Sequence, residues 1–166
     1  ALKASKPSNS REKADAIIKL LPSQEEIGCS IKEAEADFNQ LERVWLKDLA
    51  LSIGMPGDIK AMIQVCLDDR RLKKSKIFIT DKYAEPILNY FRENEDTLLN
   101  KLFTGNDPSV KCLVIFDYNK NIWYLSSMED VISYIAKQPI KISQLGVVYF
   151  GDALTMQRKG GNGVHV

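Results

Sequence analysis

The chain has 166 residues, of which 45% are hydrophobic and 27% are charged, and its formal net charge is +1. This length fits one domain, or one domain with a helical appendage, and the composition is that of an ordinary soluble protein. No apolar run approaches the roughly 20 residues that a membrane-spanning helix needs, so we expect no membrane partner. The net charge excludes neither nucleic acid nor acidic ligands, because local patches matter more than the total.

The cysteines and the histidine argue against a zinc centre. Cys29, Cys66 and Cys112 are far apart and odd in number, and His165 is the single histidine. A zinc site needs closely spaced thiolate and imidazole ligands. We interpret the cysteines as reduced structural thiols and expect a cytoplasmic protein. The chain begins at Ala1 without methionine, so an excised piece of a larger polypeptide is one interpretation.

The first half of the chain is predicted to be helical. Apolar residues at helical spacing predict a short helix over 11–21, which Pro22 ends. A second stripe of apolar residues predicts a long amphipathic helix over 31–53, with Gly54 as its C-terminal stop. A further helix is expected over 58–67. A protein partner for the long helix is one function that this pattern allows.

The second half is predicted to mix helices and strands. We therefore expect an α+β (or α/β) fold, with a helical N-terminal part, residues 1–72, packed on a small mixed β-sheet with flanking helices, residues 73–166. These two parts form either separate subdomains or one compact domain. The expected strands lie at 77–80, 112–116, 122–125, 145–150 and 153–159, and the expected helices at 82–103 and 128–137.

The stretch from Gln157 to Gly163 joins a strand end to two cations and a glycine-rich turn. Gln157 and Lys159 lie on the same side of an extended strand, because side chains alternate with period 2. An amide oxygen and an ammonium so spaced can share one phosphate, and glycines let the backbone approach an anion. The alternative is an exposed strand end with solvated charges. The candidate DNA-contacting residues here are Arg158, Gly160, Gly161 and Asn162.

A basic run between residues 70 and 76 is a second candidate for contact with DNA phosphates. The alternative is a solvated helix end, where cations favour the negative end of the helix dipole. Asp68 and Asp69 precede the run and halve its charge, which favours the alternative. The candidate residues of the run are Arg70, Arg71, Lys73 and Lys74.

The segment 155–163, placed after the strand-like segment 147–151, resembles certain type II restriction endonucleases of the PD-(D/E)xK-like class. The resemblance covers roughly 83–163 and is most specific at its end. It implies Mg²⁺-dependent cleavage of double-stranded DNA. In that superfamily a carboxylate on one strand, and an acidic residue and a lysine two apart on the next strand, hold the metal and activate water.

On this resemblance, Gln157-x-Lys159 is a variant of the second element, with a neutral amide in place of the acid and weaker metal binding as a result. Asp152 and Asp117 are the candidates for the metal-binding carboxylate, and Asp152 joins Gln157 and Lys159 as a candidate catalytic residue. Asp152 is five residues upstream of Gln157, closer than the family's usual separation, and Asp117 lies across an intervening helix. Either the true acid is elsewhere in the chain, or this stretch contacts DNA and is not the catalytic centre.

The function predicted from the sequence is a restriction-type endonuclease, or a fragment of one, that hydrolyses DNA phosphodiester bonds with Mg²⁺. The alternatives are a DNA-recognition module without catalytic power and a helical protein-interaction domain. The expected macromolecular partner is duplex DNA. The expected protein partner is a second copy, because a palindromic site mirrors a two-fold axis, or another segment of the same parent polypeptide.

Overall fold

A computed structural model describes residues 2–7, 14–34, 44–72 and 74–158. The described residues fall into two compact units, the first made of Ala1–Glu42 with Asn100–Ser133 and the second of Arg43–Leu99 with Tyr134–Val166. The elements in chain order are β1 (Leu2–Ser5), β2 (Ala16–Leu20), β3 (Glu26–Glu33), α1 (Leu46–Ser52), α2 (Gly57–Arg71), α3 (Asp81–Glu93), α4 (Glu95–Thr104), β4 (Val110–Asp117), β5 (Ile122–Ser127), α5 (Met128–Ile135), β6 (Ile140–Ile142), β7 (Val148–Phe150) and β8 (Leu154–Met156).

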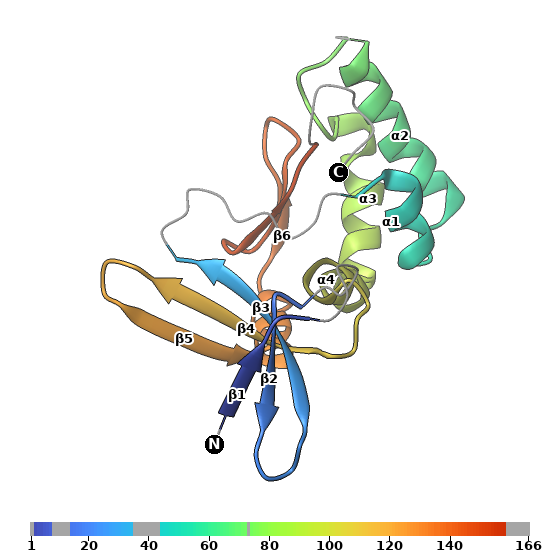
Figure 1. Ribbon diagram of the computed structural model, residues 1–166. Helices are drawn as coiled ribbons and strands as arrows, with labels where there is room; N and C mark the ends of the chain where they lie inside the picture. Colours follow the sequence, from blue (N-terminus) through green and yellow to red (C-terminus); the bar gives the residue numbers. More distant parts are fainter. Residues whose placement is uncertain (1, 8–13, 35–43, 73, 159–166) are drawn as a thin grey trace. The chain divides into compact units, whose positions relative to one another are not determined.

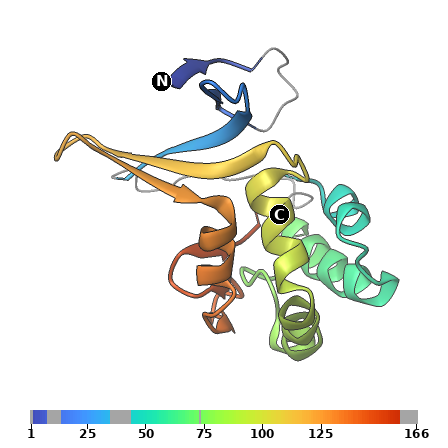
Figure 2. The ribbon, with the colours of Figure 1, turned by 90° about the horizontal axis from the view of Figure 1, so that it is seen from below.

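The first unit is built on a five-stranded sheet with the order β1-β2-β3-β4-β5 (Figure 1). Strand β3 lies at its centre, antiparallel to β2 and parallel to β4, while β4 and β5 form the long hairpin seen in Figure 2. The edge strand β5 is exposed along its whole length. The hairpin confirms the two strands and the turn predicted between residues 112 and 125, where alternating apolar residues flank a turn sequence.

The helix predicted over 11–21 is wrong, because Ala16–Leu20 is strand β2. The run Ala-Ile-Ile-Lys-Leu fits both a helical and an extended period, and pairing with β1 and β3 on its two sides selects the strand. The long helix predicted over 31–53 is also wrong at its start, where residues 31–33 belong to β3. Its middle, residues 35–43, lies outside the described residues, and its end is α1.

The second unit combines the helices α1 to α3 with the three-stranded antiparallel sheet β6-β7-β8. Helix α2 buries Ile59, Ile63, Cys66 and Leu67, which recur at helical spacing. The rings of Phe91 on α3 and Phe150 on β7 lie 6.0 Å apart between centroids, so the helices and the small sheet share one core. The strand predicted over 145–150 is shorter in the structure, where it is β7. Within the described part of the predicted strand 153–159, only β8 is a strand, and residue 159 lies outside the described residues. Strand β6 was not predicted.

Two further predictions in this unit are corrected. The strand predicted over 77–80 is irregular backbone, although Phe78 N and Ile79 N donate hydrogen bonds to Leu145 O and Gly146 O at 2.9 and 3.2 Å. The helix predicted over 82–103 is divided at Asn94, whose side-chain amide donates to Tyr90 O at 2.9 Å. A side chain that bonds its own backbone competes with the helical ladder, which explains the break.

The combination of five helices with mixed sheets in the described residues confirms the α+β prediction. Within the same residues, no helix is long and apolar enough to cross a membrane.

Candidate active site

A carboxylate, a hydroxyl and an ammonium meet where β2 begins beside β3. The Asp15 carboxylate oxygen Oδ2 accepts hydrogen bonds from Ser30 Oγ at 3.3 Å and from Ile31 N at 2.7 Å, and it lies 3.6 Å from Lys32 Nζ. We call Asp15, Ser30 and Lys32 the Asp15 cluster. All three residues belong to the first unit.

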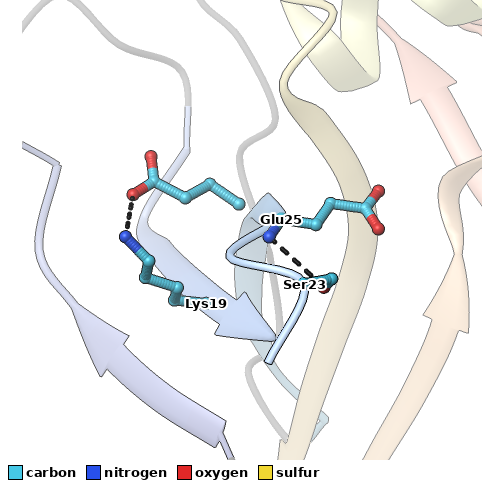
Figure 3. Close-up of polar contacts among 4 residues, drawn as sticks. Lys19, Ser23 and Glu25 are labelled. Carbon is cyan, nitrogen blue, oxygen red and sulfur yellow. Dashed lines mark hydrogen bonds and ion pairs between the residues drawn. The ribbon is translucent and has the colours of Figure 1, made fainter. Parts of the chain in front are cut away.

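The register of the β2–β3 hairpin brings these residues together. Ala16 pairs with Cys29 and Lys19 with Glu26, so Asp15, one residue before Ala16, reaches Ser30. Asp15 N continues the ladder by donating to Cys29 O at 2.8 Å. Near the turn, Lys19 Nζ pairs with Glu26 Oε1 at 3.5 Å and Glu25 N donates to Ser23 Oγ at 3.4 Å (Figure 3). A one-residue slip would turn every β3 side chain to the other face and disperse the cluster.

The three residues of the cluster differ in exposure, which indicates different roles. Ser30 is 4% exposed, and its hydroxyl can hold the carboxylate in place. The side chains of Lys32 and Asp15 are 20% and 47% exposed, so a ligand can reach both. Ser30 and Lys32 are two residues apart on one strand and therefore face the same side. The arrangement can present one negative and one positive group to a phosphodiester.

The oxygen donors of the cluster fit a magnesium ion. Mg²⁺ is usually bound through one or two carboxylates and substrate phosphates, and it keeps several waters. Asp15 supplies one carboxylate, whose second oxygen, Oδ1, takes part in none of the contacts above. Among the described residues, no group of three His, Cys, Asp or Glu side chains could hold a metal. Any metal here therefore depends on Asp15, on neutral oxygens and on its substrate.

Gly28 allows β3 to approach the segment before β4 closely. Gly28 N donates to Ser109 O at 2.7 Å, and the pairing of β3 with β4 shifts register between Gly28 and Cys29. A Cβ at position 28 would lie 2.8 Å from Ser109 O and 3.1 Å from the Cβ of Ala14. The glycine therefore sets the position of the strand that carries Ser30 and Lys32.

We expect Gly28→Ala to lower the free energy of unfolding by about 1–3 kcal/mol, because backbone must move to admit the methyl group. Urea denaturation followed by circular dichroism measures this. Gly57→Ala is the matched control, since a Cβ there meets nothing within 4 Å and Gly57 begins helix α2. Alanine favours the helix, so the control should keep or gain stability. Equal losses in the two variants would contradict the packing argument.

The Cys29 thiol, next to the cluster in sequence, is buried and unreactive. Cys29 is 1% exposed and is the register partner of Cys112 on β4. Burial raises the pKa of the Cys29 thiol from 9.0 to about 12, and the neighbouring Cys112 thiol adds to the increase. A thiol that stays protonated at neutral pH is a poor nucleophile and a poor metal ligand. Cys29 therefore packs between the strands.

This pKa predicts a loss of stability in alkali. The thiol ionises near pH 9 in the unfolded chain and keeps its proton until about pH 12 in the folded chain. The contribution of Cys29 to the free energy of unfolding is therefore complete below pH 9 and is lost as the pH rises toward 12. The slope is at most about 1.4 kcal/mol per pH unit. We expect the free energy of unfolding of Cys29→Ala to depend less steeply on pH between 9 and 11 than that of the wild type. Identical slopes would contradict this assignment.

The structure places Asp117 at the end of β4, in the first unit. Asp117 is 4% exposed, and it accepts hydrogen bonds from Lys120 N at its Oδ1 and from Lys120 Nζ at its Oδ2, both at 3.0 Å. These contacts close the turn between β4 and β5.

The other described candidates lie in the second unit. Asp152 is exposed in the turn between β7 and β8, and Gln157 and Arg158 follow β8 and are half-buried. Burial lowers the pKa of the Arg158 guanidinium, and the charge of Arg70 lowers it further. Arg158 thus lies near Arg70, so the structure brings together two cations that the sequence placed in separate segments.

The basic run begins at the end of α2. Arg70 Nη1 donates to Ser75 O at 3.4 Å, and Arg71 pairs with Asp68 at 3.2 Å. Arg71 and Lys74 are exposed. The remaining candidates, Lys73, Lys159, Gly160, Gly161 and Asn162, lie outside the described residues.

The sequence interpretation missed Asp15, Ser30 and Lys32. The signal was present, because an aspartate is followed fifteen residues later by Ser30-Ile31-Lys32. This pattern was not recognised for two reasons. Serine stands where an acid was expected, and Asp15 and Lys32 were assigned to two different helices, in which these side chains would not meet.

The fold is shared with a restriction endonuclease of known structure. The chain matches the crystal structure of restriction endonuclease MspI in complex with its cognate DNA, with a TM-score of 0.63 and 13% sequence identity. The match covers 86% of this chain and 66% of that one, so this chain spans just under two thirds of the length of its structural relative. At this identity the likeness establishes the architecture.

The sequence identifies the family more closely. The family model for the R.HinP1I restriction endonuclease matches residues 25–165 of this chain. The chain therefore belongs to the R.HinP1I restriction endonuclease family. The matched region includes Ser30, Lys32 and Gln157 and begins after Asp15. A comparison with curated protein sequences gave no match.

Proposed function

We propose that the chain hydrolyses phosphodiester bonds of double-stranded DNA with Mg²⁺, and that the Asp15 cluster is its catalytic centre. The observation that carries this proposal is the meeting of Asp15 with Ser30 and Lys32 on the adjacent strand. A carboxylate on one strand, beside a strand that carries an acidic residue and a lysine two apart, is the arrangement that the restriction-endonuclease resemblance implies. Here serine occupies the place of the second acid.

Each residue of the cluster has a role in such a reaction. Asp15 is the residue that would hold the metal, and a bound Mg²⁺ supplies Lewis acidity to the phosphoryl group under attack. Ser30 and Ile31 N orient the Asp15 carboxylate through Oδ2. The Lys32 ammonium can stabilise the negative charge that grows on the phosphoryl oxygens, or orient the attacking water. With one carboxylate in the cluster, weak metal binding follows, and millimolar Mg²⁺ should be needed.

The segment that begins at Gln157 is proposed to contact DNA. The sequence left two alternatives open: the true acid is elsewhere in the chain, or this stretch contacts DNA and is not the catalytic centre. The Asp15 cluster, which has its own lysine, supports the second alternative. Burial and, to a lesser extent, the charge of Arg70 lower the pKa of Arg158, so a phosphate bound by both cations would relieve their repulsion. The relative MspI was solved with its cognate DNA, which supports DNA as the ligand. The other proposed contacts are Arg71, Lys73, Lys74, Lys159, Gly160, Gly161 and Asn162.

The proposed partners and location follow from the substrate. A palindromic site mirrors a two-fold axis, so we propose that two copies of the chain act together, one on each strand. Another segment of a longer parent polypeptide is the alternative partner. An enzyme of this class acts on DNA inside the cell, which supports a cytoplasmic location.

A plasmid cleavage assay tests the proposed function. Supercoiled plasmids of several sequences are incubated with the purified chain and with Mg²⁺, Mn²⁺ or a chelator. We expect nicked and linear products with the metals and none with the chelator. Duplex binding without cleavage at any metal concentration would instead favour a recognition module, and no DNA binding at low salt would favour a protein-interaction domain.

A further inference from the structure

Three side chains form a row across the outer face of the small sheet. Lys141 on β6 is the register partner of Tyr149 on β7, and Tyr149 is the partner of Thr155 on β8. All three are exposed. Their neighbours along the strands point the other way and are buried, namely Ile140, Val148, Phe150 and Met156. We call Lys141, Tyr149 and Thr155 the β6–β8 row.

The β6–β8 row carries a positive charge and hydrogen-bond donors. It carries one ammonium and two hydroxyl groups, and strands β6, β7 and β8 contain no acidic residue. The nearest acid in sequence is Asp152, exposed in the turn between β7 and β8. Gln157 follows Thr155 by two residues and lies just past the end of β8. The row therefore ends close in sequence to the segment proposed to contact DNA.

The sheet beneath the row is held firmly within the second unit. Phe150 packs against Phe91 of α3, with ring centroids 6.0 Å apart. Gly146, at φ +75°, lies so close to the backbone of Ile79 that no Cβ would fit. The sheet is thus a rigid support, on which side chains keep their spacing better than on a loop.

We propose that the β6–β8 row binds the sugar–phosphate backbone of duplex DNA; this inference rests on the proposed function. Neighbouring strands are about 4.8 Å apart, so the row spans roughly 10 Å. One DNA strand carries about three phosphates over that length of axis, at 3.4 Å each. Lys141 neutralises one phosphate, while Tyr149 and Thr155 donate hydrogen bonds to phosphate oxygens. Such contacts position a protein without reading sequence.

The test is fluorescence anisotropy of a fluorescein-labelled duplex of mixed sequence, titrated with the full chain at several salt concentrations without Mg²⁺. Lys141→Gln should reduce the slope of log affinity against log salt by about 0.9, the value for one phosphate contact. Tyr149→Phe and Thr155→Val should each weaken binding roughly 2- to 10-fold and leave the slope unchanged, because they remove hydroxyls and not charge. The losses should be alike for unrelated duplex sequences.

Lys60→Gln is the matched control, because it removes one positive charge from an exposed position on α2 in the same unit. It should leave the slope unchanged. If wild type binds the duplex and the three row variants behave like Lys60→Gln, the row makes no backbone contact and the inference is overturned while the proposed function stands. If wild type binds no duplex even at low salt, the inference and the proposed function both fail.

Discussion

Asp15→Asn is expected to abolish DNA cleavage while leaving the protein folded. Asparagine keeps the shape of the side chain and an oxygen that can still accept from Ile31 N, which bonds Asp15 at 2.7 Å. It removes the one negative charge that the cluster offers to a metal ion. Lewis-acid stabilisation is worth several kcal/mol, so we expect the single-turnover cleavage rate to fall about 10³-fold or more.

Two measurements separate this effect from a loss of structure. The thermal unfolding midpoint of Asp15→Asn should stay close to that of wild type, because the half-exposed carboxylate contributes little packing. Affinity for duplex DNA without metal should be kept or raised, since a negative charge near the phosphates has been removed. A folded Asp15→Asn protein that cuts at the wild-type rate would refute the assignment of Asp15.

Lys32→Gln is expected to slow cleavage about 10²- to 10³-fold, the usual cost of removing one group that stabilises charge in the transition state. Lys32 Nζ lies 3.6 Å from Asp15 and its side chain is 20% exposed, so the ammonium is held beside the carboxylate but can reach a substrate. Glutamine keeps a polar side chain with part of the stem and removes the charge. The rate should fall at saturating Mg²⁺ as well, because the loss lies in the chemical step.

Lys19→Gln is the matched control for Lys32→Gln. Lys19 is on the neighbouring strand β2, and its ion pair with Glu26 near the turn is well exposed (Figure 3). Such pairs contribute about 0–1 kcal/mol, so the fold should survive and the cleavage rate should stay near that of wild type. If the two lysine variants slow cleavage equally, general electrostatic attraction explains the effect and Lys32 has no special role.

Local signals predicted the elements whose structure depends on neighbours in sequence. The hairpin of β4 and β5 follows from two apolar runs around a turn, and α2 from apolar residues at helical spacing. Asp117, at the end of β4, illustrates the limit of such signals. The sequence placed Asp117 in the turn, whereas it is the last residue of β4, and its bonds to Lys120 depend on how the turn closes.

The candidate active site depends on contacts that the sequence does not display. Strand β2 is a strand because β1 and β3 pair with it, and the same five residues read alone also suit a helix. Asp15 meets Ser30 and Lys32 only in the register of that hairpin. A search for an acid two residues before a lysine could not find Ser30, since a hydroxyl replaces the carboxylate there. The Gln157 segment was conspicuous because Gln157, Arg158 and Lys159 are adjacent in the sequence.

Catalysis at the Asp15 cluster can be distinguished from catalysis beside Gln157 in one experiment. Single-turnover plasmid cleavage is measured side by side for wild type, Asp15→Asn and Asp152→Asn over a range of Mg²⁺ concentrations. Both aspartates are substantially exposed, so neither change should unfold the chain. We predict that Asp152→Asn cuts like wild type and that Asp15→Asn does not cut at any Mg²⁺ concentration. Wild-type cleavage by Asp15→Asn together with loss of cleavage in Asp152→Asn would contradict catalysis at the Asp15 cluster and place the reaction beside Gln157.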